Sequence, residues 1–175
     1  MFTHKKTVWS EYLDEAVYGA NDGIVTTFAV VSGAAGAGLS GETVIIMGVA
    51  NLIADGFSMG ASSYLAIHTE EDVAKVKRVF RWHHNNHAAP RSLVTFVAFV
   101  IAGSIPLLPF FNSFAEGREF MVSACGAGIT FFVVGGLRSL VTKRGFFNSG
   151  FEMLAVGGIA AVLAYGVGAL IQSFI

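Results

Sequence analysis

Two acidic residues stand within long apolar stretches of the chain, where an ionisable side chain is costly. Asp22 lies in the segment 18–28 and Asp55 lies in the segment 51–60. A charged side chain at the centre of a bilayer costs about 2.5–3.5 kcal/mol on insertion scales, so such residues usually serve a function. A carboxylate binds divalent cations and also takes up a proton, which is the simplest chemistry for exchanging a metal ion against H⁺. We therefore interpret Asp22 and Asp55 as candidate metal ligands.

Side chains that share a helical face with these acids add further candidate ligands. Thr26 follows Asp22 by four residues, and Asn51, Asp55 and Met59 are also spaced by four. Each step of four turns about 40° around a helix, so the last three lie within an arc of about 80°. An amide, a carboxylate and a thioether together favour softer first-row metals over Mg²⁺ or Ca²⁺. Structural alternatives exist, because Asp55 can hydrogen-bond a neighbouring helix, Met59 can fill a packing gap and Asn51 can join two helices.

The composition indicates that membrane helices must position these residues. Of the 175 residues 54% are hydrophobic and 13% are charged, whereas a soluble domain carries about 25% charged residues. The charges leave five apolar windows of about 18–27 residues, and about 20 apolar residues suffice for a helix to cross a bilayer. We predict an all-α membrane protein with five transmembrane helices in a single transporter domain, residues 1–175. The expected spans are about 18–38, 43–68, 92–112, 119–139 and 150–174.

The basic residues predict the orientation of these spans. Every lysine and arginine except Arg118 falls on one side of the arrangement. By the positive-inside rule, the N-terminus is expected in the cytoplasm and the C-terminus outside or in a lumen. Residues 1–17 combine apolar residues at helical spacing with acids, so they read either as an interfacial amphipathic segment or as an extension of the first span. Their acids exclude a signal peptide.

The segments around Asp22 and Asp55 resemble the vacuolar iron transporter family, and the resemblance covers the chain from about residue 10. The segments that carry it are DGIVTTFA at 22–29, ANLIADGFSMG at 50–60 and YLA at 64–66, and more generically Gly150–Gly158 and Tyr165–Gly168. The resemblance implies a homodimer that moves Fe²⁺, and in some members Mn²⁺, out of the cytosol in exchange for protons. It also implies a pathway at the dimer interface that is lined by an aspartate and a methionine, which match Asp22 and Met59.

The chain departs from the family pattern at one candidate ligand. Plant members carry a glutamate where this chain has Asn51, which removes one negative charge. We take it as a hypothesis that Asp55, one turn away, offsets this loss.

A second departure concerns the segment between the second and third spans. Eukaryotic members insert a long metal-binding helical domain there, whereas only about 22 residues run from Glu70 to Arg91 here. Glu70, His83 and His87 remain as weaker candidates for capturing metal, because His83 and His87 are four residues apart. The alternative is a solvated loop that simply contains histidines.

We predict a proton-coupled transporter that exports a divalent transition metal, Fe²⁺ or else Mn²⁺, from the cytoplasm. The alternative is a passive divalent-cation channel formed at a dimer interface, and a purely structural membrane protein would leave the intramembrane acids unexplained. An enzyme is not expected, because no His-Glu-x-x-His or aspartyl protease motif is present.

The remaining expectations concern partners and location. The expected partners are the transported metal, protons, the lipid bilayer and a second copy of the chain. No prosthetic cofactor is expected, and the net charge of -1 argues against nucleic acid as a partner. The short chain favours the plasma (inner) membrane of a prokaryote, whereas a eukaryotic protein would lie in the vacuolar membrane.

Overall fold

A computed structural model describes residues 8–76, 88–111, 117–142 and 144–175. The secondary structure in this part of the chain is entirely helical, which confirms the predicted all-α class. The elements in chain order are α1 (Val8–Gly36), α2 (Gly41–Val76), α3 (Ala88–Ser104), the 3₁₀ helix η1 (Ile105–Phe111), α4 (Glu119–Thr142) and α5 (Phe146–Gln172).

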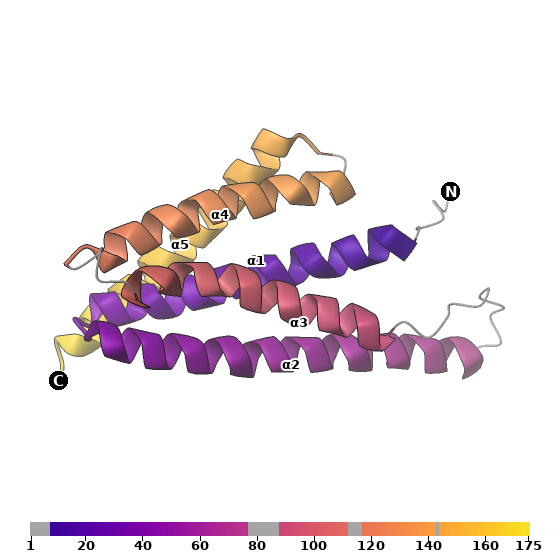
Figure 1. Cartoon of the computed structure of the whole chain (residues 1–175), viewed down its shortest axis with the longest axis horizontal. Coiled ribbons are helices and arrows are strands. Elements are labelled where there is room, and N and C mark those ends of the chain that lie inside the picture. The colour runs from indigo at the N-terminus through magenta and orange to yellow at the C-terminus, as the bar shows by residue number, and fades with distance from the viewer. Residues whose placement is uncertain (1–7, 77–87, 112–116, 143) are drawn as a thin grey trace.

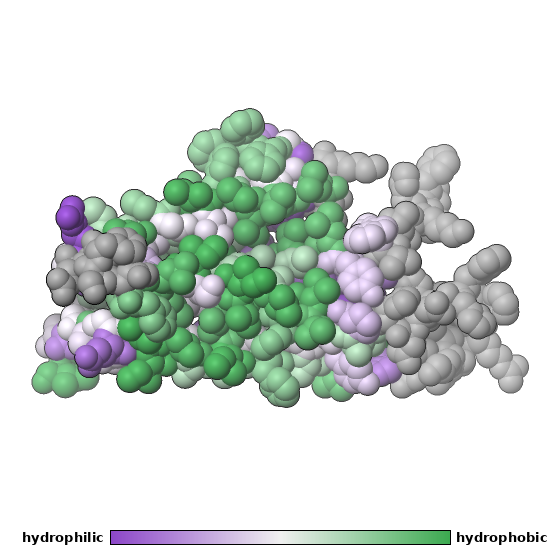
Figure 2. Space-filling model, viewed as in Figure 1, coloured by the Kyte–Doolittle hydropathy of each residue, from purple (hydrophilic) through white to green (hydrophobic). Residues whose placement is uncertain are grey.

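Four helical segments among the described residues are long and apolar enough to cross a membrane. They are Gly41–Thr69, Ala88–Phe111, Glu119–Leu140 and Phe146–Gln172. The remaining helix, α1, has 29 residues, which extend about 44 Å at 1.5 Å per residue, but it carries several acids. On the visible face, apolar side chains fill the middle of the molecule and polar ones gather toward its two ends (Figure 2), as the surface of a membrane protein requires.

α1 is the central helix of the bundle. It contacts each of the other four α-helices, while α2 also packs on α3 and α4 also packs on α5. In Figure 1, α1 runs between the α2–α3 pair and the α4–α5 pair, and the start of α1 lies at the opposite end of the bundle from the end of α5. Consecutive α-helices run in opposite directions through the bundle (Figure 1).

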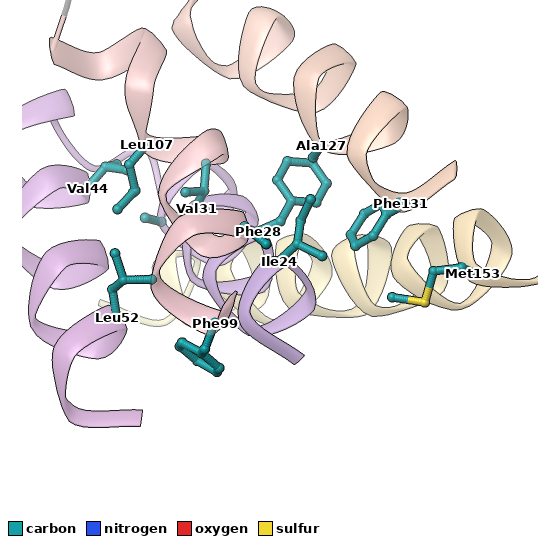
Figure 3. Packing of buried hydrophobic residues seen from close by; sticks show 12 residues of the cluster. Ile24, Phe28, Val31, Val44, Leu52, Phe99, Leu107, Ala127, Phe131 and Met153 are labelled. Atoms are coloured by element: carbon teal, nitrogen blue, oxygen red, sulfur yellow. The ribbon is translucent and has the colours of Figure 1, made fainter. Parts of the chain in front are cut away.

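The core is formed by one apolar stripe of α1 and the helices around it. Ile24, Phe28 and Val31 recur at spacings of three and four, as expected for the buried face of a helix, and none is more than 6% exposed. Phe28 meets Phe131 of α4 edge to face, with ring centroids 6.0 Å apart. Figure 3 shows these side chains gathered between the helices, with Phe99 of α3 on the other side of the stripe.

Glycines let α1 approach its neighbours to backbone contact. A Cβ atom on Gly19 or Gly23 would collide with the backbone of Thr95 or Phe99 in α3. Farther along α1, a Cβ atom on Gly36 would collide with the backbone of Tyr165 in α5. Small residues commonly allow such close helix packing in membranes, so these positions fix where α3 and α5 cross α1.

A tight turn joins α1 and α2 into an antiparallel hairpin. Gly38 adopts a φ of 63°, a left-handed conformation that glycine adopts without strain. The backbone N–H of Leu39 donates to the carbonyl of Ala34 at 3.0 Å, and the Ser40 hydroxyl accepts from the N–H of Thr43 at 3.4 Å. These contacts end α1 and begin α2, so they set the register in which the two helices run past each other.

The helix bounds add detail that the sequence windows lack. Residues 8–17 are continuous with the first predicted span in one helix. α2 continues past residue 68 to Val76, and α3 gives way at Ile105 to the 3₁₀ helix that contains Pro106 and Pro109. Proline lacks the N–H donor that an α-helix interior needs, which explains this change of helix type.

Candidate functional site

The structure brings together the two acids that the sequence singled out. Asp22 on α1 and Asp55 on α2 lie close enough for the charge of one carboxylate to act on the other. Asp22 is exposed at the surface of the single chain, and Asp55 is half-buried. Two carboxylates from two helices therefore share one side of the α1–α2 hairpin.

The hairpin register places the other candidates beside them. In an antiparallel pair, four residues forward along α1 and four residues backward along α2 cover the same axial distance in the same direction, about 6 Å. The hydrogen bond between Ser63 and Glu15 fixes the register and puts Asp22 near the level of Asp55, so this step puts Thr26 near the level of Asn51. One step in the other direction puts Met59 about one turn from Asp22, on the side of the α1 start.

The side chain of Thr26 is engaged with its own helix. Its hydroxyl donates to the carbonyl of Asp22 at 2.9 Å, with a longer contact of 3.4 Å to Gly23. Such back-bonding is common for threonine in helices. The hydroxyl proton is therefore committed to the backbone, and only the oxygen lone pairs remain for a ligand.

Asn51 and Met59 differ in their surroundings. Met59 is half-buried and packs against the hydrophobic core. The amide nitrogen of Asn51 is buried and has no hydrogen-bond partner among the described residues. An unpaired buried polar group costs about 1–3 kcal/mol. The packing of the single chain therefore leaves this amide without the hydrogen-bond acceptor that it needs.

Phe99 of α3 packs against the helix positions next to both acids. Gly23 and Gly56, which directly follow Asp22 and Asp55 in the sequence, both face it. A Cβ atom on Gly23 would collide with the Phe99 backbone, and one on Gly56 would lie 3.2 Å from its ring carbon Cδ1. Adjacent residues on a helix point about 100° apart, so both acids are turned away from α3.

The structure contains a polar network near the start of α1 that the sequence does not predict. The carboxylate of Glu15 accepts hydrogen bonds from Arg91 at 2.8 Å, from Thr95 at 2.7 Å and from Ser63 at 3.1 Å. Arg91 also donates to Glu11 at 3.4 Å. The sequence held one signal for this network, because Glu11 and Glu15 are spaced by four and share a face of α1 with Asp22, but nothing in it identified Arg91 as their partner.

A second ion-pair cluster joins the cytoplasmic-side ends of α4 and α5 in the predicted topology. Glu152 lies 3.6 Å from Arg144 and 4.0 Å from Arg138. All three side chains are at least 42% exposed, and exposed pairs of this kind contribute little to stability.

The side chains of the weaker candidate ligands, Glu70, His83 and His87, lie outside what the structure describes. His83 and His87 fall outside the described residues, and the side chain of Glu70 does as well. Within the described residues, no group of three or more His, Cys, Asp or Glu side chains is placed to hold a metal ion. One chain therefore offers Asp22 and Asp55 as a pair of carboxylates, and divalent metals usually take four or more ligands.

Comparison with known proteins reveals similarity along almost the whole chain. The model of the VIT family matches residues 13–92 and 80–169. The chain is 29% identical to the Vacuolar iron transporter of Toxoplasma gondii (strain ATCC 50861 / VEG), over 93% of this chain and 75% of that protein. That alignment runs over 227 positions, more than the 175 residues of this chain, so the relative has residues without a counterpart here.

Two further relatives show how the similarity is distributed. The Vacuolar iron transporter homolog 3 of Arabidopsis thaliana is 27% identical, over 94% of this chain and 85% of that protein. The Vacuolar iron transporter of Plasmodium falciparum (isolate 3D7) is 43% identical over 68 residues, which are 38% of this chain and 25% of that protein. The similarity is thus full-length at low identity and higher over a shorter stretch.

Proposed function

Because the chain belongs to the VIT family, we propose that it carries Fe²⁺ out of the cytoplasm in exchange for protons. Relatives that match over nearly the whole chain bear the name Vacuolar iron transporter, and the chain has the helices of a multi-pass membrane protein. The observation that carries the proposal is the juxtaposition of Asp22 and Asp55 within two mostly apolar helices.

The carboxylate pair supplies the chemistry of exchange. Two negative charges held close together in a poorly solvated place repel each other. A divalent cation that binds between them relieves this repulsion, and so do protons that bind to them. Metal and protons therefore compete for the same oxygens, and a proton supplied from the outer side helps to release the metal there.

The thioether of Met59 adjusts the choice of metal. Sulfur favours borderline and soft first-row cations over Mg²⁺ and Ca²⁺, which prefer oxygen alone. Fe²⁺ is the proposed substrate, with Mn²⁺ as a second one. Met59 lies on the same helical face as Asp55, one turn away.

A second copy of the chain completes the site in this proposal. Asp22 is exposed in the single chain, and a carboxylate that faces lipid is costly. A two-fold interface that covers Asp22 brings two copies of each acid together. Four carboxylates and two thioethers then satisfy the ligand number that one chain does not reach.

The orientation in the proposal follows the bases of the described residues. Arg91 lies at the start of α3, Arg138 near the end of α4 and Arg144 before α5, while Arg118 lies before α4. In the bundle, α1 and α3 begin, α4 ends and α5 begins at one end, whereas α4 begins at the other end (Figure 1). The positive-inside rule then assigns the start of α1 to the cytoplasm.

Transport in proteoliposomes under an imposed pH gradient tests the proposal. Fe²⁺ kept reduced is placed on the side of the cytoplasmic face, and its entry into the other compartment is followed with an internal fluorescent chelator. Acid in the receiving compartment should speed Fe²⁺ movement, and Mn²⁺ should compete better than Mg²⁺. A rate that ignores the pH gradient would instead favour the passive channel, and no metal movement at all would remove transport.

A further inference from the structure

We propose that Glu15 and Arg91 form the positioning pair that holds α1 in register with α2 and α3 and so sets the separation of Asp22 and Asp55. This inference rests on the proposed function, and it assigns to Glu15 a role other than binding metal.

One carboxylate links three helices. Glu15 of α1 accepts from Ser63 of α2 and from Arg91 and Thr95 of α3, at 3.1, 2.8 and 2.7 Å. The side chains of Glu15 and Arg91 are only 14% and 20% exposed. Hydrogen bonds to a charged group in such surroundings are stronger and more directional than those between neutral groups.

The donors occupy both oxygens of Glu15. Oε1 accepts from Arg91, and Oε2 accepts from Thr95 and Ser63. A metal would have to displace these donors and would meet the guanidinium charge. The geometry therefore makes Glu15 a structural link, in contrast to Asp22, for which no such side-chain donor is present among the described residues.

The link and the candidate site lie about two turns apart along both α1 and α2. Glu15 precedes Asp22 by seven residues, so it lies two turns away and within about 20° on α1. Ser63 follows Asp55 by eight residues on the antiparallel helix, an axial distance of about 12 Å compared with about 10 Å on α1. The Glu15–Ser63 hydrogen bond and the Asp22–Asp55 pair are thus two successive levels of one hairpin.

A link at one level controls the next, because α-helices are stiff over two turns. Gly19 lies between the two levels of α1 and packs on the backbone of Thr95, the same residue that donates to Glu15. Losing the link would let α1 slide or rotate on α3. The two carboxylates would then no longer hold the separation that suits one cation.

Buried ion pairs of this kind are better explained by register than by stability. Removing charges from water is costly and their attraction often does not exceed that cost, while the fixing of register is the better-attested role. Glu15–Arg91 is therefore expected to act on metal affinity more than on folding.

The test compares transport kinetics with thermal stability in purified full-length variants. Glu15→Gln keeps an oxygen acceptor but loses the charge, Arg91→Gln loses the cation, and Ser63→Ala removes only the donor from α2. Glu15→Gln and Arg91→Gln should raise the KM for Fe²⁺ about tenfold or more, with a smaller change in maximal rate per folded protein. Ser63→Ala should shift KM in the same direction by less, and Arg91→Lys should recover part of the loss.

A matched control uses an exposed ion pair elsewhere among the described residues. Arg144→Gln breaks the exposed contact between Arg144, which lies just before α5, and Glu152 of α5, far from the α1–α2 hairpin in the sequence, and should leave KM unchanged. If Glu15→Gln folds and keeps the wild-type KM, the positioning role is wrong. If loss of Glu15 lowers only the amount of folded protein, the pair is merely structural.

A second readout does not depend on transport. In a Cys125→Ser background, Asp22→Cys and Asp55→Cys are joined by thiol reagents of graded length, and products at the mass of one chain are counted. Adding Glu15→Gln should broaden the range of lengths that react. An unchanged range overturns the positioning role whether or not the wild-type protein moves metal. A broadened range, together with a wild-type protein that moves no metal, leaves positioning intact and refutes the proposed function.

Discussion

Gly23 of α1 packs directly on the backbone of Phe99 in α3. Gly56 of α2 faces the ring of the same phenylalanine, which is completely buried. Each glycine directly follows an acid in the sequence, so one residue of α3 supports both members of the carboxylate pair. The spacing of the acids therefore depends on a helix that contributes no ligand.

A methyl group at Gly23 should disturb this support. Its Cβ would collide with the Phe99 backbone, and overpacking of this kind costs about 1–3 kcal/mol. We expect Gly23→Ala to lower the midpoint of thermal unfolding in detergent and to reduce Fe²⁺ transport. Gly158→Ala is the control, because nothing lies within 4 Å of its added Cβ; equal stability of the two variants would contradict the close approach.

Neutralising Asp22 should abolish transport without unfolding the protein. Asp22 is exposed in the single chain, so Asp22→Asn preserves its size and removes only a charge that the fold does not need. Fe²⁺ uptake into proteoliposomes should fall by at least about a hundredfold, consistent with loss of an essential ligand, while size-exclusion profiles stay the same. Glu42→Gln, which changes an exposed acid in the first turn of α2, should transport normally. Normal transport by Asp22→Asn would refute the role of this residue.

A carboxylate at position 51 should strengthen metal binding. Asn51 is level with Thr26 and one turn from Asp55, and additional ligand charge raises the affinity of a carboxylate site for a cation. Asn51→Glu should lower the KM for Fe²⁺ several-fold and slow release into the receiving compartment. Asn51→Gln has nearly the same length without the charge, so an equal effect from both variants would show that size, rather than charge, is responsible.

Truncation of the core should affect stability and not selectivity. Phe131 is 1% exposed and meets Phe28, and replacing a buried phenylalanine by alanine costs about 3–5 kcal/mol. Phe131→Ala should lower the unfolding midpoint strongly but leave the preference among Fe²⁺, Mn²⁺ and Zn²⁺ unchanged in the folded fraction. Phe174→Ala, at a position 81% exposed, should change neither. A changed metal preference in Phe131→Ala would indicate that the core reaches the site.

The sequence predicted the helical class and the number of helices because apolar windows of membrane length are a strong local signal. It also singled out Asp22 and Asp55, since an acid in such a window is costly. It did not predict Phe99 as their common support or Arg91 as the partner of Glu15. These contacts join residues 43 to 76 positions apart, and one sequence contains no direct record of distant contacts.

One prediction from the sequence depends on residues that the structure does not describe. Metal capture by His83 and His87 stays a prediction, because neither lies within the described residues. The acids at the start of α1 show the opposite case. In the sequence, Glu11 and Glu15 look like part of a polar helical surface. In the structure they pair with Arg91 of α3.

The central position of α1 also bears on how the protein is made. α1 precedes its partners along the chain and carries acids that a bilayer accepts poorly, yet its glycines pack on the backbones of α3 and α5. During synthesis, α1 is therefore fully covered by protein only after α3 and α5 have been made. We expect chains that stop before residue 88 to insert α1 inefficiently, and chains that extend through α3 to insert it well. Glycosylation-site mapping in microsomes measures this difference, and equal insertion of both lengths would show that α1 needs no such help.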